Sequence, residues 1–388
     1  MNPTRTGTLV DLSANENPLG PSPGAVSAMQ SAMGELHRYP DRGCRGLKAA
    51  LAARLGVTEP QIAIGNGSCE IIELAVRGLI RPGASVILGT PGFPAYRAAV
   101  RRAGGRAVLV PARNYRDNLE AMLGVIDDST RLVLLGNPAN PTGTLTGLEP
   151  LLRFLERLPP GLTVVIDEAY RDFVDDPSYP DAIELLESGR PVIAVRSFSK
   201  AHGLAGLRLG YAVAAVDLIA RLDDEHQQFN TNRLAQAAAL GALEDGAHLR
   251  AVVELNRRGR AELFDGLVAR GFAPLPSQAN FILVPVPHAR QLARQLAERG
   301  VLVKDLDRYG ADGCIRVSVG LPEWHASFFR ALDELAAEPD WAAGEGKPVP
   351  THGDQDDWSE PRASSPFAAA YRGAVPAGDG RGIWTRSR

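Results

Sequence analysis

Short apolar runs alternate with segments of helical periodicity through the middle of the chain. The runs span residues 85–88, 107–110, 132–135, 163–166, 192–195 and 209–213. Continuous apolar runs of this length are typical of strands that are buried on both faces, and the amphipathic segments between them predict helices. This alternation predicts βαβ units, in which a mostly parallel sheet lies between two layers of helices.

The hydrophobic pattern changes after residue 255. A helical pattern over 234–268 leads into apolar runs at 281–284, 301–303 and 315–319, and a second helical pattern over 323–337 follows them. The later block predicts a small α+β domain, and the 388 residues of the chain are enough for two domains. The sequence therefore predicts an α/β protein with a large domain over 40–255 and a small domain over 256–338.

Residues 339–388 differ in composition from the rest of the chain. Glycine and proline are frequent there, and three of the four tryptophans, Trp341, Trp358 and Trp384, lie in this stretch. A high content of glycine and proline without periodicity is typical of irregular segments, although the tryptophans suit anchoring onto a surface. We expect an irregular tail outside the catalytic fold.

The composition of the chain limits which kinds of binding partner and which cellular environment are expected. The content of 45% hydrophobic and 22% charged residues is that of an ordinary globular protein, and a net charge of −3 gives no reason to expect nucleic acid or an anionic membrane. The sequence contains no 18-residue apolar span and no apolar signal core near its start, which predicts a cytoplasmic protein. Three scattered cysteines and seven histidines without ligand spacing predict no disulfide framework and no metal site.

The first candidate for chemistry is Lys200, which follows the apolar run 192–195. Ser197 and Ser199 lie beside it, and Arg208 follows eight residues later. A lysine amine forms a Schiff base with an aldehyde such as that of pyridoxal 5'-phosphate (PLP). The hydroxyls and the planar guanidinium are donors that suit a phosphate group. A lysine in a serine-rich turn is by itself usually an ordinary residue, so this interpretation needs support from elsewhere.

A second candidate motif lies at the end of the run 163–166, where Asp167 is followed by Tyr170. A carboxylate at the carboxyl end of a buried strand faces the crevice in which open α/β sheets bind ligands. There Asp167 can pair with the protonated pyridine nitrogen of PLP, and Tyr170 can hydrogen-bond the 3-oxygen of the ring. The residues alone leave open a simpler interpretation, a helix N-cap at Asp167 and a core tyrosine at Tyr170.

Gly67, Ser68 and Cys69 precede an amphipathic pattern over 71–80. The free N–H groups at the first turn of a helix bind anions, so we place the phosphate of the cofactor there. The alternative is a helix N-cap without a ligand. Asn140 lies in a loop over 137–143 with two X-Pro steps, which is either a rigid turn that fixes its side chain or an ordinary loop.

Together these motifs resemble the fold type I PLP-dependent aminotransferases of class I and II. The order Asn-Pro-Thr-Gly, Asp-x-x-Tyr, Ser-x-Ser-Lys and Arg is the order of that family. Within it, the chain is most similar to histidinol-phosphate aminotransferases, through the segments 15–23, 39–41, 65–68 and 277–283. The resemblance covers residues 9–337 and implies the fold type I architecture with PLP as cofactor.

The resemblance also implies roles for single residues. Lys200 holds the cofactor and acts as the catalytic base, with Asp167 and Tyr170 as its catalytic partners. Phe93 stacks on the pyridine ring, unless it is a core residue under a proline-rich turn. The arm over 1–39 packs with the small domain, and Tyr39 reaches the cofactor phosphate of a partner subunit in a homodimer. An exposed Tyr-Pro turn is the alternative for Tyr39.

For the substrate, the resemblance implies binding by Asn17, Lys304 and Arg316. Lys304 stands where histidinol-phosphate enzymes commonly carry arginine, so the cationic charge is kept but the bidentate fork is lost. The expected reaction converts histidinol phosphate and 2-oxoglutarate, its small-molecule partners, to imidazole acetol phosphate and glutamate. The alternatives are transfer from aromatic or other amino acids, or a divergent PLP lyase, decarboxylase or cyclase of specialised biosynthesis. A dehydrogenase is excluded because no Gly-x-Gly-x-x-Gly follows a strand.

Overall fold

The computed structural model describes residues 9–187 and 189–338. The tail expected over 339–388 lies outside these described residues. The chain divides into two compact units, and the larger comprises Glu16–Arg257 with Gln278–Asn280. The small unit comprises, among the described residues, 9–15, 258–277 and 281–338. The unit boundary near the N-terminus lies at Asn15, inside the expected arm over 1–39, and the domain boundaries expected from the sequence stay a prediction.

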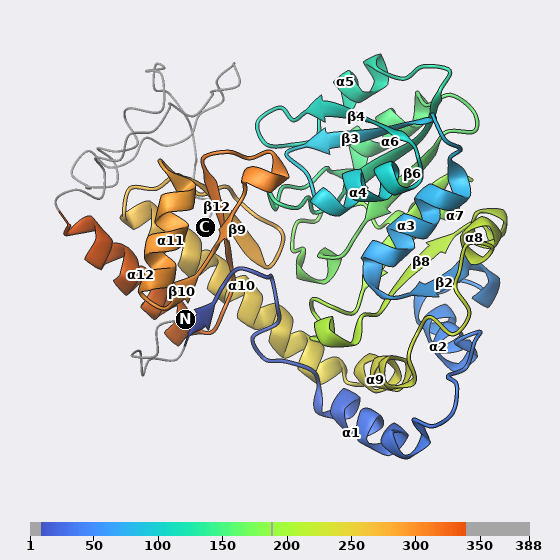
Figure 1. Ribbon diagram of the computed structural model, residues 1–388, viewed down its shortest axis with the longest axis horizontal. Helices are drawn as coiled ribbons and strands as arrows, with labels where there is room; N and C mark the ends of the chain where they lie inside the picture. Colours follow the sequence, from blue (N-terminus) through green and yellow to red (C-terminus); the bar gives the residue numbers. More distant parts are fainter. Residues whose placement is uncertain (1–8, 188, 339–388) are drawn as a thin grey trace. The chain divides into compact units, whose positions relative to one another are not determined.

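A seven-stranded sheet forms the centre of the large unit (Figure 1). Its strands are β2 (Ile62–Gly65), β3 (Ser85–Thr90), β4 (Arg106–Pro111), β5 (Thr130–Gly136), β6 (Thr163–Asp167), β7 (Val192–Ser197) and β8 (Gly210–Ala214). Their order is β2-β8-β7-β6-β5-β3-β4. The strands from β4 to β7 pair in parallel, whereas β8 is antiparallel to both of its neighbours. The expected mostly parallel sheet is confirmed.

Helices cover both faces of this sheet because its strands are apolar on both sides. In β5, Leu132 and Leu134 belong to one buried cluster, whereas Val133 and Leu135 belong to another. The first cluster includes side chains of α3 (Gly67–Leu79), α4 (Pro94–Arg102) and α8 (Val216–Asp223). The second cluster includes side chains of α1 (Pro23–Ala32), α2 (Arg45–Leu55), α5 (Leu119–Gly124), α6 (Leu148–Glu156), α7 (Ala182–Glu187) and α9 (Arg233–Glu244).

The small unit contains an antiparallel sheet of order β11-β12-β9 and a separate parallel pair of β1 and β10. Its strands are β1 (Val10–Asp11), β9 (Phe281–Pro285), β10 (Val301–Leu302), β11 (Lys304–Asp305) and β12 (Cys314–Ser318). The helices α11 (Ala289–Glu298) and α12 (Pro322–Ala336), with the end of α10 (Gly246–Ala269), cover a core of their own. Of the apolar run expected over 301–303, only Val301 and Leu302 lie in a strand, β10, and the neighbouring strand β11 of the other sheet begins at Lys304.

Within the described part of the chain, no helix is both long enough and apolar enough to span a membrane. The same residues contain no group of three or more histidine, cysteine or acidic side chains arranged to hold a metal ion.

Candidate active site

The carboxyl ends of β6 and β7 meet at one edge of the large sheet, because the two strands are parallel neighbours. Asp167 is the last residue of β6 and Ser197 is the last residue of β7. The turn after β7 carries Ser199 and Lys200, and the Ser199 N–H donates to Ser197 Oγ at 3.0 Å. The side chains of Asp167, Ser197 and Ser199 are all buried. The fold thus brings the two principal motifs of the sequence to the same edge.

The carboxylate of Asp167 is held by neutral donors. The Tyr96 hydroxyl donates to Asp167 Oδ2 at 2.8 Å, and the Ala169 N–H donates to Oδ1 at 3.1 Å. Burial raises the pKa of Asp167 to about 6, although both hydrogen bonds and the charge of Lys200 act in the opposite direction. A cationic group placed beside this carboxylate favours its ionised form, so the site suits a protonated ring nitrogen.

Lys200, Tyr170 and Asn140 lie together beside this carboxylate edge. The Lys200 ammonium is 5.8 Å from the centroid of the Tyr170 ring. The Asn140 amide donates to the Tyr170 hydroxyl at 3.4 Å, and Tyr170 itself is buried. The side chains of Asn140 and Lys200, from two different loops, therefore both approach Tyr170.

A small anion cradle lies between α3 and the loop that carries Arg208. Gly67, the first residue of α3, has a φ of +79°, and a Cβ atom there would lie 2.6 Å from Arg208 Nη2. Arg208 Nη1 also donates to Ser199 Oγ at 3.4 Å. The guanidinium, the Ser199 hydroxyl and the N–H groups at the start of α3, where Ser68 lies, suit the oxygens of a phosphate group.

Cys69 occupies the first turn of α3 and is half-buried. Burial and the charge of Asp167 raise the pKa of its thiol, whereas Arg208 and Lys200 oppose the shift. A raised pKa keeps the thiol protonated at neutral pH, so it adds no negative charge next to the cradle.

Phe93 precedes α4 and contacts Tyr96 edge to face, with the ring centroids 5.6 Å apart and the planes at 89°. Tyr96 was not among the site residues expected from the sequence, although its hydroxyl is the donor that holds Asp167. One signal was present: Phe93 and Tyr96 are three residues apart at the start of a helix, so they lie on the same side of its first turn.

Tyr39 and Asn17, which were expected in the site, make contacts elsewhere in the large unit. Tyr39 is 77% exposed, and its ring stacks on Phe229 with the centroids 4.6 Å apart. The Asn17 amide donates to the Gly20 carbonyl at 3.2 Å and to the Ala201 carbonyl at 3.0 Å. Asn17 thereby fastens the N-terminal segment of the large unit to the loop that directly follows Lys200.

In the small unit, Lys304 of β11 pairs with Arg316 of β12 in antiparallel register. Residues directly opposite each other in such a pair project from the same face of the sheet. Arg316 is 3% exposed, donates to the Ser13 carbonyl at 3.0 Å, and lies 5.2 Å and 5.3 Å from the ring centroids of Phe281 and Tyr309. Two neighbouring cations repel each other, so an anion placed between them is favoured.

A lysine, a buried carboxylate and an anion cradle at one edge of a mostly parallel sheet define the class of fold type I PLP-dependent enzymes. The comparisons with known proteins identify the family. The chain matches the family model "Aminotransferase class I and II" over residues 7–325, and it belongs to that family.

Relatives with assigned names cover most of the chain. The histidinol-phosphate aminotransferase of Moorella thermoacetica is 44% identical over 85% of this chain and 86% of its own. Histidinol-phosphate aminotransferase 2 of Ralstonia nicotianae is 42% identical over 86% and 91%. Among solved structures, the histidinol-phosphate aminotransferase of Sinorhizobium meliloti in complex with PLP is 32% identical, with a TM-score of 0.77 over 84% of this chain and 91% of that one.

Membership of this family makes the chain a PLP-dependent aminotransferase, as the sequence predicted. The residues present fit the cofactor. A Cβ atom at Gly67 would clash with the Arg208 guanidinium, so glycine lets this donor lie against the start of α3, and Asp167 combines burial with neutral donors. The function, the cofactor and the fold class expected from the sequence are thereby confirmed at the level of the family.

Proposed function

We propose that the protein transfers an amino group from histidinol phosphate to 2-oxoglutarate. The observation that carries this proposal is the identity of 44% and 42% to two named histidinol-phosphate aminotransferases over about 85% of the chain. The adjacent cations Lys304 and Arg316 support it, because this donor carries a phosphate group and a pair of cations favours a doubly charged anion.

The proposed holder of the cofactor ring is the group around Asp167. Asp167 would hold the ring nitrogen, Phe93 would support the ring, and Asn140 and Tyr170 would hold its oxygen. The phosphate is assigned to the cradle and the residues beside it, which are Gly67, Ser68, Cys69, Ser197, Ser199 and Arg208. Their convergence at the ends of β6 and β7 and at the start of α3 supports these assignments.

The proposed mechanism uses Lys200 as the proton carrier. Bound PLP supplies an electron sink for negative charge on the amine-bearing carbon of the substrate. Lys200 Nζ takes the proton from that carbon, and the Asp167 carboxylate keeps the ring nitrogen charged. Tyr96 serves this step indirectly, since its hydroxyl holds Asp167 in place.

The first test is a single-turnover absorbance measurement on the purified holoenzyme. Histidinol phosphate is compared with histidinol, which lacks the phosphate, and with phenylalanine, glutamate and phosphothreonine. We expect fast conversion of the cofactor to its amine form with histidinol phosphate and glutamate, and slow conversion with the others. Fast conversion with phenylalanine or phosphothreonine, and none with histidinol phosphate, would refute the proposed donor and favour one of the alternative reactions.

Lys304→Met tests the phosphate site separately. It should raise KM for histidinol phosphate about tenfold, which is the weakening expected from the loss of one charge-assisted hydrogen bond. Turnover of histidinol should not change, since it offers no phosphate. Lys48, which pairs with Asp223 at 3.7 Å in the large unit, provides a control as Lys48→Met.

We also propose a homodimer in which Tyr39 of one subunit completes the site of the other. The exposure of Tyr39 supports this proposal. Mixing Lys200→Ala protein with Tyr39→Ala protein should then restore activity, because one site of each mixed dimer has both residues intact. A monomer in sedimentation, or no gain on mixing, would contradict the proposal. The cytoplasmic location stays a prediction.

A further inference from the structure

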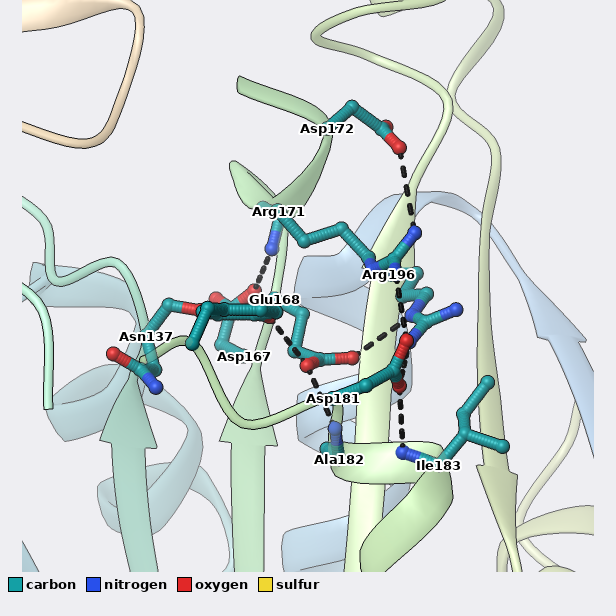
Figure 2. A network of polar contacts seen from close by, with 11 residues as sticks. Asn137, Asp167, Glu168, Arg171, Asp172, Asp181, Ala182, Ile183 and Arg196 are labelled. Carbon is teal, nitrogen blue, oxygen red and sulfur yellow. Dashed lines mark hydrogen bonds and ion pairs between the residues drawn. The ribbon is translucent and has the colours of Figure 1, made fainter. Parts of the chain in front are cut away.

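A buried network of charges lies directly behind the ends of β6 and β7 (Figure 2). Arg196 Nε donates to Glu168 Oε2 at 2.8 Å, and Arg196 Nη2 donates to Asp181 Oδ1 at 2.5 Å. Arg171 Nη2 donates to Asp181 Oδ2 at 2.6 Å. Glu168 is 1% exposed and Arg196 is 3% exposed, so the central ion pair is removed from water.

Neutral groups also donate hydrogen bonds to the carboxylates of Glu168 and Asp181. The Tyr179 hydroxyl donates to Glu168 Oε1 at 2.5 Å, and the Ala182 N–H donates to the same oxygen at 3.0 Å. The Ile183 N–H donates to Asp181 Oδ1 at 2.9 Å. Burial alone would lower the pKa of Arg196, but the charge of Glu168 and the other anionic neighbours outweighs it and raises that pKa. The pKa of Asp181 is lowered, because the charges of Arg196 and Arg171 outweigh its burial, so this carboxylate and the Arg196 guanidinium both carry charge around neutral pH.

The network residues alternate with the proposed cofactor residues along both strands. Val165 and Val195 belong to the cluster on the α3 and α4 side, whereas Ile166 and Ala194 belong to the opposite cluster. Because side chains change sides at every residue of a strand, Asp167 and Ser197 continue on the first side. Glu168, which follows Asp167, and Arg196, which precedes Ser197, therefore lie on the second side.

We propose that Glu168 and Arg196 are positioning residues, whose ion pair fixes the end of β6 against the end of β7 and thereby sets Asp167 relative to the segment from Ser197 to Lys200. The Glu168 N–H also donates to the Val195 carbonyl at 2.8 Å, so main chain and side chain tie the same two strand ends. This inference rests on the proposed assignment of Asp167 and Lys200, but it does not depend on which amino donor is used.

The energetics favour a positioning role over a purely stabilising one. Removing two charges from water costs about as much as their mutual attraction returns, so a well-packed apolar pair of the same size is often equally stable. An ion pair with a forked donor differs from an apolar pair in being directional. It holds one relative placement of the two strands, whereas apolar side chains tolerate small shifts between them.

Glu168→Gln is the main test, because it keeps the shape and one acceptor oxygen but removes the charge that pairs with Arg196. In the cofactor-free full chain we expect PLP to bind roughly tenfold to a hundredfold more weakly, the size of effect seen when residues that orient the ligands of a metal site are removed. In the holoenzyme, the visible circular dichroism of bound PLP should change, because it reports how the ring is held. The loss of activity should appear in kcat, with KM little changed.

Two further variants make the test specific. Arg196→Lys keeps the charge but loses the fork that spans Glu168 and Asp181, so its cofactor affinity should lie between those of the wild type and Glu168→Gln. Leu151→Ala, in a buried position of α6, is the matched control for a general loss of stability. It should lower Tm but leave the cofactor affinity and the visible circular dichroism unchanged.

The outcomes separate the possibilities. If Glu168→Gln lowers Tm as Leu151→Ala does and leaves PLP affinity, circular dichroism and kcat at wild-type values, the network only stabilises the fold and the inference is wrong. If PLP affinity and the spectrum change but the enzyme still prefers another donor over histidinol phosphate, the proposed substrate fails and the positioning role stands.

Discussion

Asp167 and Glu168 are neighbours in the chain and both are buried, yet their surroundings differ in kind. Asp167 accepts hydrogen bonds from a phenol and a backbone amide, which are neutral, and burial raises its pKa to about 6. Glu168 is paired with the guanidinium of Arg196 at 2.8 Å. The Asp167 carboxylate is thus able to pair with a cationic ligand, whereas the Glu168 carboxylate already pairs with the guanidinium of Arg196.

The difference follows from the alternation of side chains at the end of a strand. A single step along the chain moves a carboxylate from the side of α3 and α4 to the side of α7. The functional consequence is a division of labour between adjacent residues. A residue whose charge is matched inside the fold fixes geometry, whereas a residue held by neutral donors can respond to a bound group.

The largest effect is expected on the Asp167 side, from Lys200→Ala. This change removes the reactive amine, so we expect no detectable turnover. It also removes a positive charge that lowers the pKa of Asp167, so that pKa should rise further. Steady-state assays with histidinol phosphate measure the first effect, and Lys48→Ala controls for the loss of a lysine. Near-native activity of the Lys200→Ala protein would rule out the proposed mechanism.

The second expected effect comes from Asp167→Asn, which keeps the shape but removes the charge assigned to the ring nitrogen. We expect kcat to fall about a thousandfold, the size seen when a preorganised electrostatic group is removed from an active site. Single-turnover rates with saturating donor measure it. The proposed role would fail if Asp167→Asn and Glu168→Gln had equal effects on kcat, because only the first alters the group assigned to the ring nitrogen.

The parts of the fold and of the site that could be predicted from the sequence are those marked by local signals. Asp167 and Lys200 stand at the ends of apolar runs, and the rule that ligands bind at the carboxyl ends of parallel strands was sufficient to place them together. The strand β2 was not predicted. Its four residues end in Gly65, and glycine is depleted in strands, so the local strand signal is weak. The end of β10 was not predicted either. The apolar run continues to Val303, but β10 ends at Leu302 and β11 begins at Lys304, and no local signal marks this break.

The charge network was beyond sequence reasoning. Glu168, Asp181 and Arg196 are spread over 28 residues, and each alone resembles an ordinary surface charge. They meet only because β6 and β7 are parallel neighbours and because α7 begins beside them. The partner of Asp167 was missed for the same reason, since Tyr96 reaches it from a helix 71 residues away in sequence.

The pH dependence of stability offers a third, smaller contrast in the cofactor-free protein. The folded pKa of Asp167, about 6, lies above the ordinary value of 3.8. Between these values the folded state binds more protons than the unfolded state, so the contribution of Asp167 to stability falls as pH rises through this window. Two pKa units correspond to about 3 kcal/mol. Asp167→Asn should lack this loss in urea unfolding between pH 4 and pH 8.

Asp181 provides the opposite case, because Arg196 and Arg171 outweigh burial and lower its pKa. Its stabilising contribution is complete above the unfolded pKa and is lost only as pH falls through the lower folded value. Asp181→Asn should therefore cost the same free energy of unfolding at pH 5 and at pH 8. If the free energy of unfolding changed with pH in the same way for Asp167→Asn and Asp181→Asn, the contrast between the two carboxylates would be wrong.

The smallest expected effect uses two tyrosines that differ in which carboxylate they serve. Tyr96→Phe removes a hydroxyl from Asp167, and Tyr179→Phe removes one from Glu168. Loss of a hydrogen bond to a charged group amounts to roughly tenfold in an equilibrium or rate. For Tyr96→Phe this loss should appear in kcat, because Asp167 then holds its proton more tightly and supports the ring charge less well.

Tyr179→Phe should leave kcat and PLP affinity close to wild type, because the ion pair with Arg196 and the bond from the Ala182 N–H still hold Glu168. Its cost should appear in Tm alone. Measurements of kcat and Tm on both variants show whether each tyrosine serves catalysis through Asp167 or stability through Glu168. A kcat loss in Tyr179→Phe as large as that in Tyr96→Phe would show that the two carboxylates act as one unit, and the division between them would have to be abandoned.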